Sequence, residues 1–159
     1  MPSISNNLTG AAGEHLVAAQ LSIRGFSVGL TRGGSRAVDM LASNADGSRS
    51  IAIQLKASCD AWTERKKKRE TSHWSFMMST SDIQDQERTS ALIYVFVSLK
   101  GQSADSPDYF VVPGDVVSQR LEEKYRLRNR KTNIRMLDIF QHEKKRFHGR
   151  WDIIENVLS

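Results

Sequence analysis

The first hydrophobic pattern along the chain has the period of a helix. Small and aliphatic residues recur with the helical period from about Leu8 to Arg24, which predicts a helix. Thr9 is suited to cap its N-terminus, and Gly25 stands where a helix stop is expected. Strand-like spacing follows and predicts three short strands: Phe26–Leu30, Ala37–Ser43 and Ser50–Ala57.

Turn residues separate these strands. Gly33-Gly34-Ser35 lies between the first and the second, and Asp46-Gly47 marks a tight reversal between the second and the third. The second and third strands are therefore expected to be antiparallel neighbours.

The later part of the chain contains one segment, Ala91–Leu99, that is apolar throughout and rich in β-branched residues. This pattern predicts a strand covered on both faces. The order helix, three strands, helix, strand predicts an α/β sandwich around a central mixed sheet, with an αβββαβ core. The other elements expected are a polar loop Cys59–Ser72, a strand His73–Met78, a helical turn within Ser81–Arg88, a strand Tyr109–Val112, a helix from Pro113 to about Arg128, a strand near Ile134–Leu137 and a short last helix.

Composition fits one globular domain. The chain has 159 residues, of which 39% are hydrophobic and 26% charged, enough to bury a core without disulfides. No apolar run approaches the roughly 20 residues needed to cross a bilayer, so no membrane association is expected. The lone Cys59 suits a reducing compartment, and we expect a cytoplasmic protein.

Positive charge is concentrated outside the first sixty residues. The net charge is +5, which favours a polyanionic partner without establishing one. Trp62 and Trp74 flank the most compact basic run, where they either contact bases or anchor packing. The run could bind phosphates or form a solvated loop, and consists of Arg65, Lys66, Lys67, Lys68 and Arg69.

Glu14 departs from the pattern of the first helix. Val17, Ala18 and Leu21 share its side of the helix, so the carboxylate lies on or beside the buried face, where charge is costly without a partner. Favourable pairing with the helix dipole is the simpler alternative.

Asp39, Gln54 and Lys56 depart from the strand patterns. Asp39 interrupts an otherwise apolar strand, and alternation places Gln54 and Lys56 on one face of the third strand. If Asp46-Gly47 closes the hairpin, Asp39 lies beside that pair. A half-solvated strand would produce the same alternation.

These residue types fit phosphodiester chemistry. Asp39, the amide oxygen of Gln54 and the main-chain carbonyl of Leu55 are ligands for a hard divalent ion, with Glu14 as an auxiliary ligand. Such an ion polarises a phosphate and activates water. Lys56 could orient that water or stabilise charge developing on phosphorus. Mg²⁺ or Mn²⁺ is the expected cofactor.

The set Gly10-Ala11-Ala12-Gly13-Glu14, Asp39 and Gln54-Leu55-Lys56 resembles the PD-(D/E)XK nuclease superfamily over the first third of the chain. The Gln-x-Lys form is similar to Mrr-type restriction endonucleases, and the order of the motifs is similar to Holliday-junction resolvases. The resemblance implies a restriction-endonuclease-like fold in a single domain over residues 1–159, with a catalytic core at about 8–100 and a basic elaboration at about 108–159. No proline precedes Asp39, and Gln54 replaces the usual acidic residue.

The resemblance implies a metal-dependent endonuclease that hydrolyses DNA. The neutral Gln54 keeps an alternative open, a weakened or inactive nuclease fold that acts as a nucleic-acid-binding or interaction module. A homodimer would supply two sites for cutting two strands, and a partner protein could supply specificity.

Overall fold

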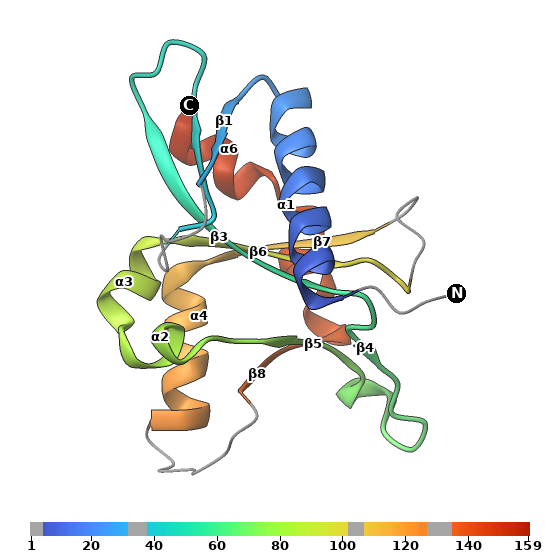
Figure 1. Cartoon of the computed structure of the whole chain (residues 1–159). Helices are drawn as coiled ribbons and strands as arrows, with labels where there is room; N and C mark the ends of the chain where they lie inside the picture. The colour runs from blue at the N-terminus through green and yellow to red at the C-terminus, as the bar shows by residue number, and fades with distance from the viewer. Residues whose placement is uncertain (1–4, 32–37, 102–106, 127–134) are drawn as a thin grey trace.

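The computed structural model describes residues 5–31, 38–101, 107–126 and 135–159. Its centre is a five-stranded mixed sheet in the order β1-β2-β3-β6-β7. Neighbouring strands are antiparallel except for β3 and β6, which run parallel (Figure 1). These strands are β1 (Ser27–Leu30), β2 (Met40–Ser43), β3 (Ser50–Ser58), β6 (Ile93–Ser98) and β7 (Asp108–Pro113).

A second sheet lies against one face of the first and is ordered β4-β5-β8 with antiparallel pairing. Its strands are β4 (Trp62–Thr63), β5 (His73–Met77) and β8 (Met136–Phe140). The chain visits this sheet between β3 and β6, so the crossover joining the parallel pair carries strands as well as helices.

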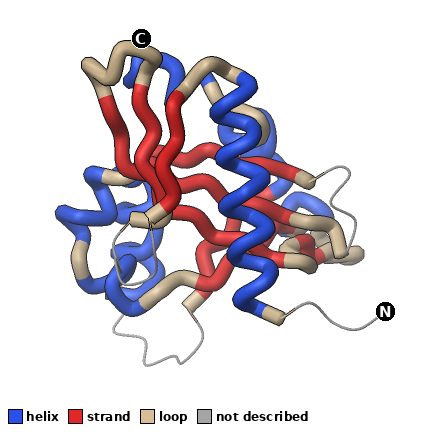
Figure 2. The backbone as a smooth tube through the Cα atoms, turned by 45° about the horizontal axis from the view of Figure 1, so that its top comes forward, coloured by secondary structure: helices blue, strands red, loops and turns tan. Residues whose placement is uncertain are grey.

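Helices cover both faces of the central sheet. The longest, α1, crosses one face (Figure 2), which it shares with α6, whereas α4 and α5 pack with the second sheet on the other. The helices are α1 (Asn6–Ile23), α2 (Thr80–Gln84), α3 (Gln86–Ala91), α4 (Gly114–Leu121), α5 (Lys144–Phe147) and α6 (Asp152–Leu158), with a π-helical turn at Glu122–Arg126 and 3₁₀ turns at Arg69–Thr71 and Gln141–Glu143. Among the described residues, no helix combines the length and the apolar character needed to cross a membrane.

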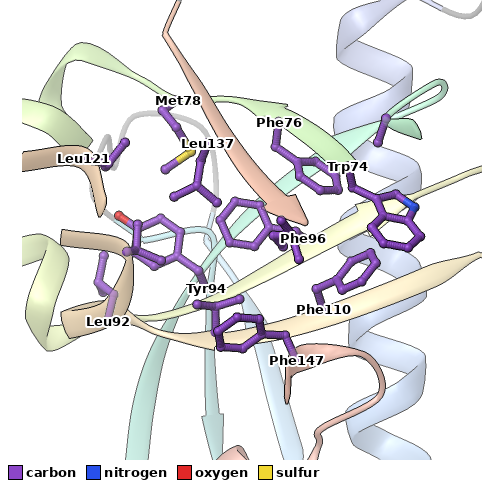
Figure 3. Packing of buried hydrophobic residues seen from close by; sticks show 14 residues of the cluster. Trp74, Phe76, Met78, Leu92, Tyr94, Phe96, Phe110, Leu121, Leu137 and Phe147 are labelled. Carbon is purple, nitrogen blue, oxygen red and sulfur yellow. The ribbon is translucent and has the colours of Figure 1, made fainter. Parts of the chain in front are cut away.

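Two hydrophobic cores differ in composition. Between the two sheets the core is aromatic: the rings of Phe76 and Phe96 lie 5.0 Å apart, and those of Trp74 and Phe110 lie 4.8 Å apart (Figure 3). Under α1 and α6 the core is mainly aliphatic, and its fully buried members include Val17, Leu21, Ile53, Val95 and Ile154. Alternate residues of β3 and β6 supply both cores, as a strand period of two requires.

The predicted α/β sandwich is confirmed, and so is the antiparallel β2–β3 hairpin. Its turn uses Gly47 at φ +72°, with the Ser48 amide donating to Asp46 Oδ1 at 2.9 Å. The predicted strand Ala91–Leu99 appears as β6, with residues buried on both faces. Gly25, at φ +87°, follows the end of α1 as expected.

Several predicted boundaries were wrong. Ser5, rather than Thr9, caps α1 by accepting from the Leu8 amide, whereas Thr9 is buried within the helix. The helix predicted to reach Arg128 ends at Leu121 and continues as a π-helical turn through Arg126. The predicted turn Gly33-Gly34-Ser35 and the start of the strand at Ile134 lie outside the described residues.

Candidate active site

Gly13 sets the distance between α1 and β3. A Cβ atom at this position would lie 2.7 Å from the Ala57 Cβ and 2.9 Å from a Leu55 methyl group, closer than carbon atoms approach without displacement. The missing side chain therefore lets the helix rest directly on the strand. Glu14, the next residue, is partly buried at the edge of this contact, as its helical phase predicted.

Asp39 lies at the point where β2 leaves β3. It immediately precedes β2 rather than interrupting it, which corrects the predicted mid-strand position. Its backbone still follows the ladder: its amide donates to the Ile53 carbonyl at 3.0 Å, and its carbonyl accepts from the Thr31 amide at 3.0 Å. Beyond Ile53, a side-chain contact replaces the backbone pairing with β3: Asp39 Oδ2 accepts from the Leu55 amide at 2.6 Å.

Gln54 is the second partner of this carboxylate. Its Nε2 donates to Asp39 Oδ2 at 2.6 Å, so the predicted proximity of the two residues is present. The Gln54 side chain is buried, and within the described part of the chain its Oε1 has no hydrogen-bond donor. A buried acceptor without a donor costs about 1–3 kcal/mol, so this oxygen is suited to an external donor or cation.

The electrostatics of the two candidate acidic ligands are unfavourable without a cation. Burial raises the pKa of Asp39, and the hydrogen bond from Leu55 and the charge of Lys56 only partly offset it. Burial also raises the pKa of Glu14, and the nearby Asp39 charge raises it further. The effect of the Asp39 charge on the pKa of Glu14 means that the two carboxyl groups lie near each other. A bound cation would stabilise the ionised form of both.

Lys56 makes its ion pair with a residue that the sequence analysis did not single out. Its Nζ lies 3.0 Å from Asp82 Oδ2, and the Asp82 side chain is 1% exposed. Lys56 and Arg88 both act to lower the pKa of Asp39, so both positive charges lie close enough to influence that carboxylate. The available sequence signal was Ser79-x-x-Asp82, a capping box, which predicts a helix start but not a long-range ion pair.

The residues around Asp39 offer oxygen atoms as ligands for a divalent metal. Among the described residues, no three His, Cys, Asp or Glu side chains lie together as a metal site. The candidate ligands are instead two carboxylates, from Asp39 and Glu14, together with the amide oxygen of Gln54 and the main-chain carbonyl of Leu55. All of these ligands are oxygen atoms, which Mg²⁺ and Mn²⁺ prefer. The residues present therefore fit a hard cation that is bound by only two charged side chains.

The basic run lies on the connection between β4 and β5, at the opposite end of β5 from α2 (Figure 1). Its side chains are exposed, and four of them line a groove of about 610 Å³ together with Glu64, Thr71, His73, Asp138 and Phe140. Trp74 is a packing residue in the aromatic core. Trp62 is 41% exposed, and its ring lies 4.5 Å from that of Trp74.

Comparisons with known proteins give a match in structure. No family model matches the chain, and no curated protein sequence matches it. The structure is similar to that of the bacterial homing endonuclease I-Ssp6803I, with a TM-score of 0.59 over 96% of this chain and 92% of that chain. The fold is nuclease-like. At 13% sequence identity this similarity shows a shared arrangement of helices and strands. It does not show a shared chemistry, which has to be argued from the residues of this chain.

Proposed function

We propose that the chain is a metal-dependent endonuclease that hydrolyses phosphodiester bonds in DNA. The observation that carries this function is the pairing of Asp39 with Gln54 where β2 and β3 separate. A carboxylate whose pKa is raised by burial lies beside a buried amide oxygen that has no donor among the described residues. The fold, shared with a bacterial homing endonuclease, supports DNA as the substrate class.

Each residue has a role that follows from its place. Asp39 and Gln54 would hold the ion, with the Leu55 carbonyl and Glu14 as further ligands. A bound Mg²⁺ or Mn²⁺ would polarise the scissile phosphate and lower the pKa of water. Lys56, on the same face of β3 as Gln54, would orient the attacking water or stabilise negative charge on the phosphate oxygens.

The groove beside the basic run would bind the DNA backbone. Contacts from Arg65 to Arg69 would neutralise phosphates without reading sequence. From His73, in the groove, to Ser79, at the start of α2, the chain extends at most about 20 Å, or about six base pairs at 3.4 Å per pair. Ser79 in turn contacts Asp82, the ion-pair partner of Lys56, and we propose that one duplex reaches from the groove to this site. Cutting both strands would need a homodimer, a partner protein or two binding events.

The test is cleavage of supercoiled, linear, branched and single-stranded DNA with Mg²⁺, Mn²⁺ or chelator. Asp39→Ala and Lys56→Ala should each abolish cutting. Asp46→Asn is the matched control, because it removes an exposed carboxylate from the distant end of the β2–β3 hairpin. Metal-dependent cutting that survives both active-site substitutions would come from a contaminant and would contradict the assignment.

A second function is favoured by the small number of acidic ligands. Within the described residues the site has no third acidic, histidine or cysteine ligand, which favours a weakened nuclease fold that binds nucleic acid without cutting it. The separating result is DNA binding that is independent of metal, with no cleavage under any condition. Under this second function, Gln54→Glu should increase divalent-ion affinity by restoring a charged ligand.

A further inference from the structure

Asp82 is surrounded by hydrogen-bond donors. Its Oδ2 accepts from the Ser79 amide at 2.9 Å and from Ser79 Oγ at 2.6 Å, and it pairs with Lys56 Nζ at 3.0 Å. Its Oδ1 accepts from Arg88 Nη2 at 3.0 Å and from the Tyr94 hydroxyl at 2.8 Å. A carboxylate this buried can stay ionised only because these donors replace water.

Helix capping accounts for only two of these five contacts, both from Ser79. The capping box of α2 uses Oδ2 and Ser79 alone. The Lys56 contact comes from β3 and the Tyr94 contact from β6, two neighbouring parallel strands. Asp82 therefore joins α2 to the face of the sheet that carries Gln54 and Lys56.

A lysine side chain that must hold a fixed position needs such an anchor. Its long stem has many rotamers, and fixing it costs up to about 2 kcal/mol of conformational entropy. Lys56 is only 17% exposed, so its ammonium group also loses water. A buried anionic partner both fixes the rotamer and replaces the lost hydration.

We propose that Asp82 is a positioning residue: it holds the Lys56 ammonium and the Arg88 guanidinium in fixed places beside the Asp39 carboxylate. The catalytic consequence rests on the proposed nuclease function, because these charges matter for rate only if a phosphate is cleaved at Asp39. The positioning itself is a property of the folded protein and can be measured without substrate or metal.

The direct test uses ¹⁵N-lysine NMR of the ammonium groups. The protons of a free lysine ammonium group exchange rapidly with water. An ammonium group held by Asp82 exchanges more slowly and gives an observable resonance. We expect such a resonance from Lys56 in the wild-type protein, distinguished from that of the paired Lys124 by its loss in Lys56→Gln. It should disappear in Asp82→Asn, which keeps the shape and removes the charge. Its absence from the folded wild-type protein would overturn the proposal without any Asp82 variant.

Asp85→Asn is the matched control. Asp85 is an exposed carboxylate that caps the adjacent helix α3 by accepting from the Arg88 amide at 3.1 Å, and it has a longer contact of 3.9 Å with the Arg88 guanidinium. If Asp82 acted only as a helix cap, both substitutions would have similar effects. We expect Asp85→Asn to keep the Lys56 resonance and the cleavage rate.

The second readout is the cleavage rate at saturating DNA. Asp82→Asn should lower it by about 10- to 100-fold, the usual effect of losing a residue that orients a catalytic group, with DNA affinity unchanged. Wild-type cleavage by Asp82→Asn would overturn the positioning role.

The two ideas fail in different ways. If the wild-type protein cuts no DNA while the Lys56 resonance depends on Asp82 as expected, the nuclease function fails and the positioning role stands. If the protein cuts DNA but the resonance is unaffected by Asp82→Asn, the positioning role fails and the nuclease function stands.

Discussion

Asp39 and Asp82 both contact residues of β3, yet the pKa values of these two carboxyl groups are shifted in opposite directions. Burial alone would raise the pKa of Asp82, but the Lys56 charge and the Ser79 hydrogen bonds outweigh it and lower the value to about 2. At Asp39 burial prevails and the pKa is raised. Asp82 is satisfied by the protein's own donors, whereas Asp39 and its neighbour Gln54 retain capacity for a cation. The difference separates a carboxylate that organises the site from one that is suited to bind.

The largest effect expected from this difference is on catalysis. Asp39→Asn keeps an acceptor for the Leu55 amide but loses the charge, so metal binding should fail. A loss of several kcal/mol of stabilisation by the metal corresponds to a fall in cleavage rate of about 10³-fold or more. Thermal unfolding should show no loss of stability in this variant. An Asp39→Asn variant that is strongly destabilised but still cuts DNA would mean that Asp39, rather than Asp82, has the structural role.

Asp82→Ala should give the complementary result, with stability as the main loss. The substitution leaves Lys56, Arg88 and Tyr94 without their shared acceptor. Removing one partner of a buried ion pair costs about 3–5 kcal/mol. Urea unfolding monitored by circular dichroism measures this change. A cost below about 1 kcal/mol, typical of an exposed pair, would mean that the Asp82 contacts are weak in solution.

Acid should affect the two carboxylates with opposite signs. The pKa of Asp82 is lowered from 3.8 to about 2, so its ionised form stabilises the fold above about pH 4 by an amount on the order of 2 kcal/mol, which is lost as the pH falls toward 2. The raised pKa of Asp39 means that its ionised form destabilises the fold near neutral pH, and this penalty disappears as the pH falls through the raised pKa toward 3.8.

Unfolding free energies between pH 2 and 8 test this opposition. Asp82→Asn should reduce the loss of stability at the acidic end, to which Asp138 also contributes, and Asp39→Asn should reduce the gain of stability on mild acidification, to which Glu14 also contributes. If both variants follow the wild-type profile in parallel, neither carboxylate has the environment described.

The smallest effect is expected far from either carboxylate, in the basic groove. Lys67→Gln should weaken DNA binding less than about tenfold and lower the slope of log affinity against log salt by about 1. The matched control is Arg150→Gln, an exposed cation already paired with Asp152 at 2.7 Å, which should leave the slope unchanged. Equal effects of the two substitutions would mean that the groove has no special role in binding.

The sequence predicted the parts of the site that depend on local patterns. Strand alternation placed Gln54 and Lys56 on one face, and the Asp46-Gly47 turn brought Asp39 beside them, because both features act over short distances along the chain. Asp82 escaped prediction because its contacts to Lys56 and Tyr94 depend on how α2 packs across two parallel strands. The cap of α1 was predicted at Thr9 but lies at Ser5, because helix propensity alone does not decide where the first turn begins.

The last strand and helices have a consequence for the synthesis of the protein. Leu137 and Ile139 complete the aromatic core, and Trp151 and Ile154 complete the aliphatic one. The chain therefore cannot bury either core until these residues leave the ribosome. At about 5–20 residues per second, the stretch from Tyr94 to Ile154 takes roughly 3–12 s, during which Asp39, Lys56 and Asp82 already exist without their final surroundings. Assembly of the site should thus wait until β8 and α6 have been synthesised.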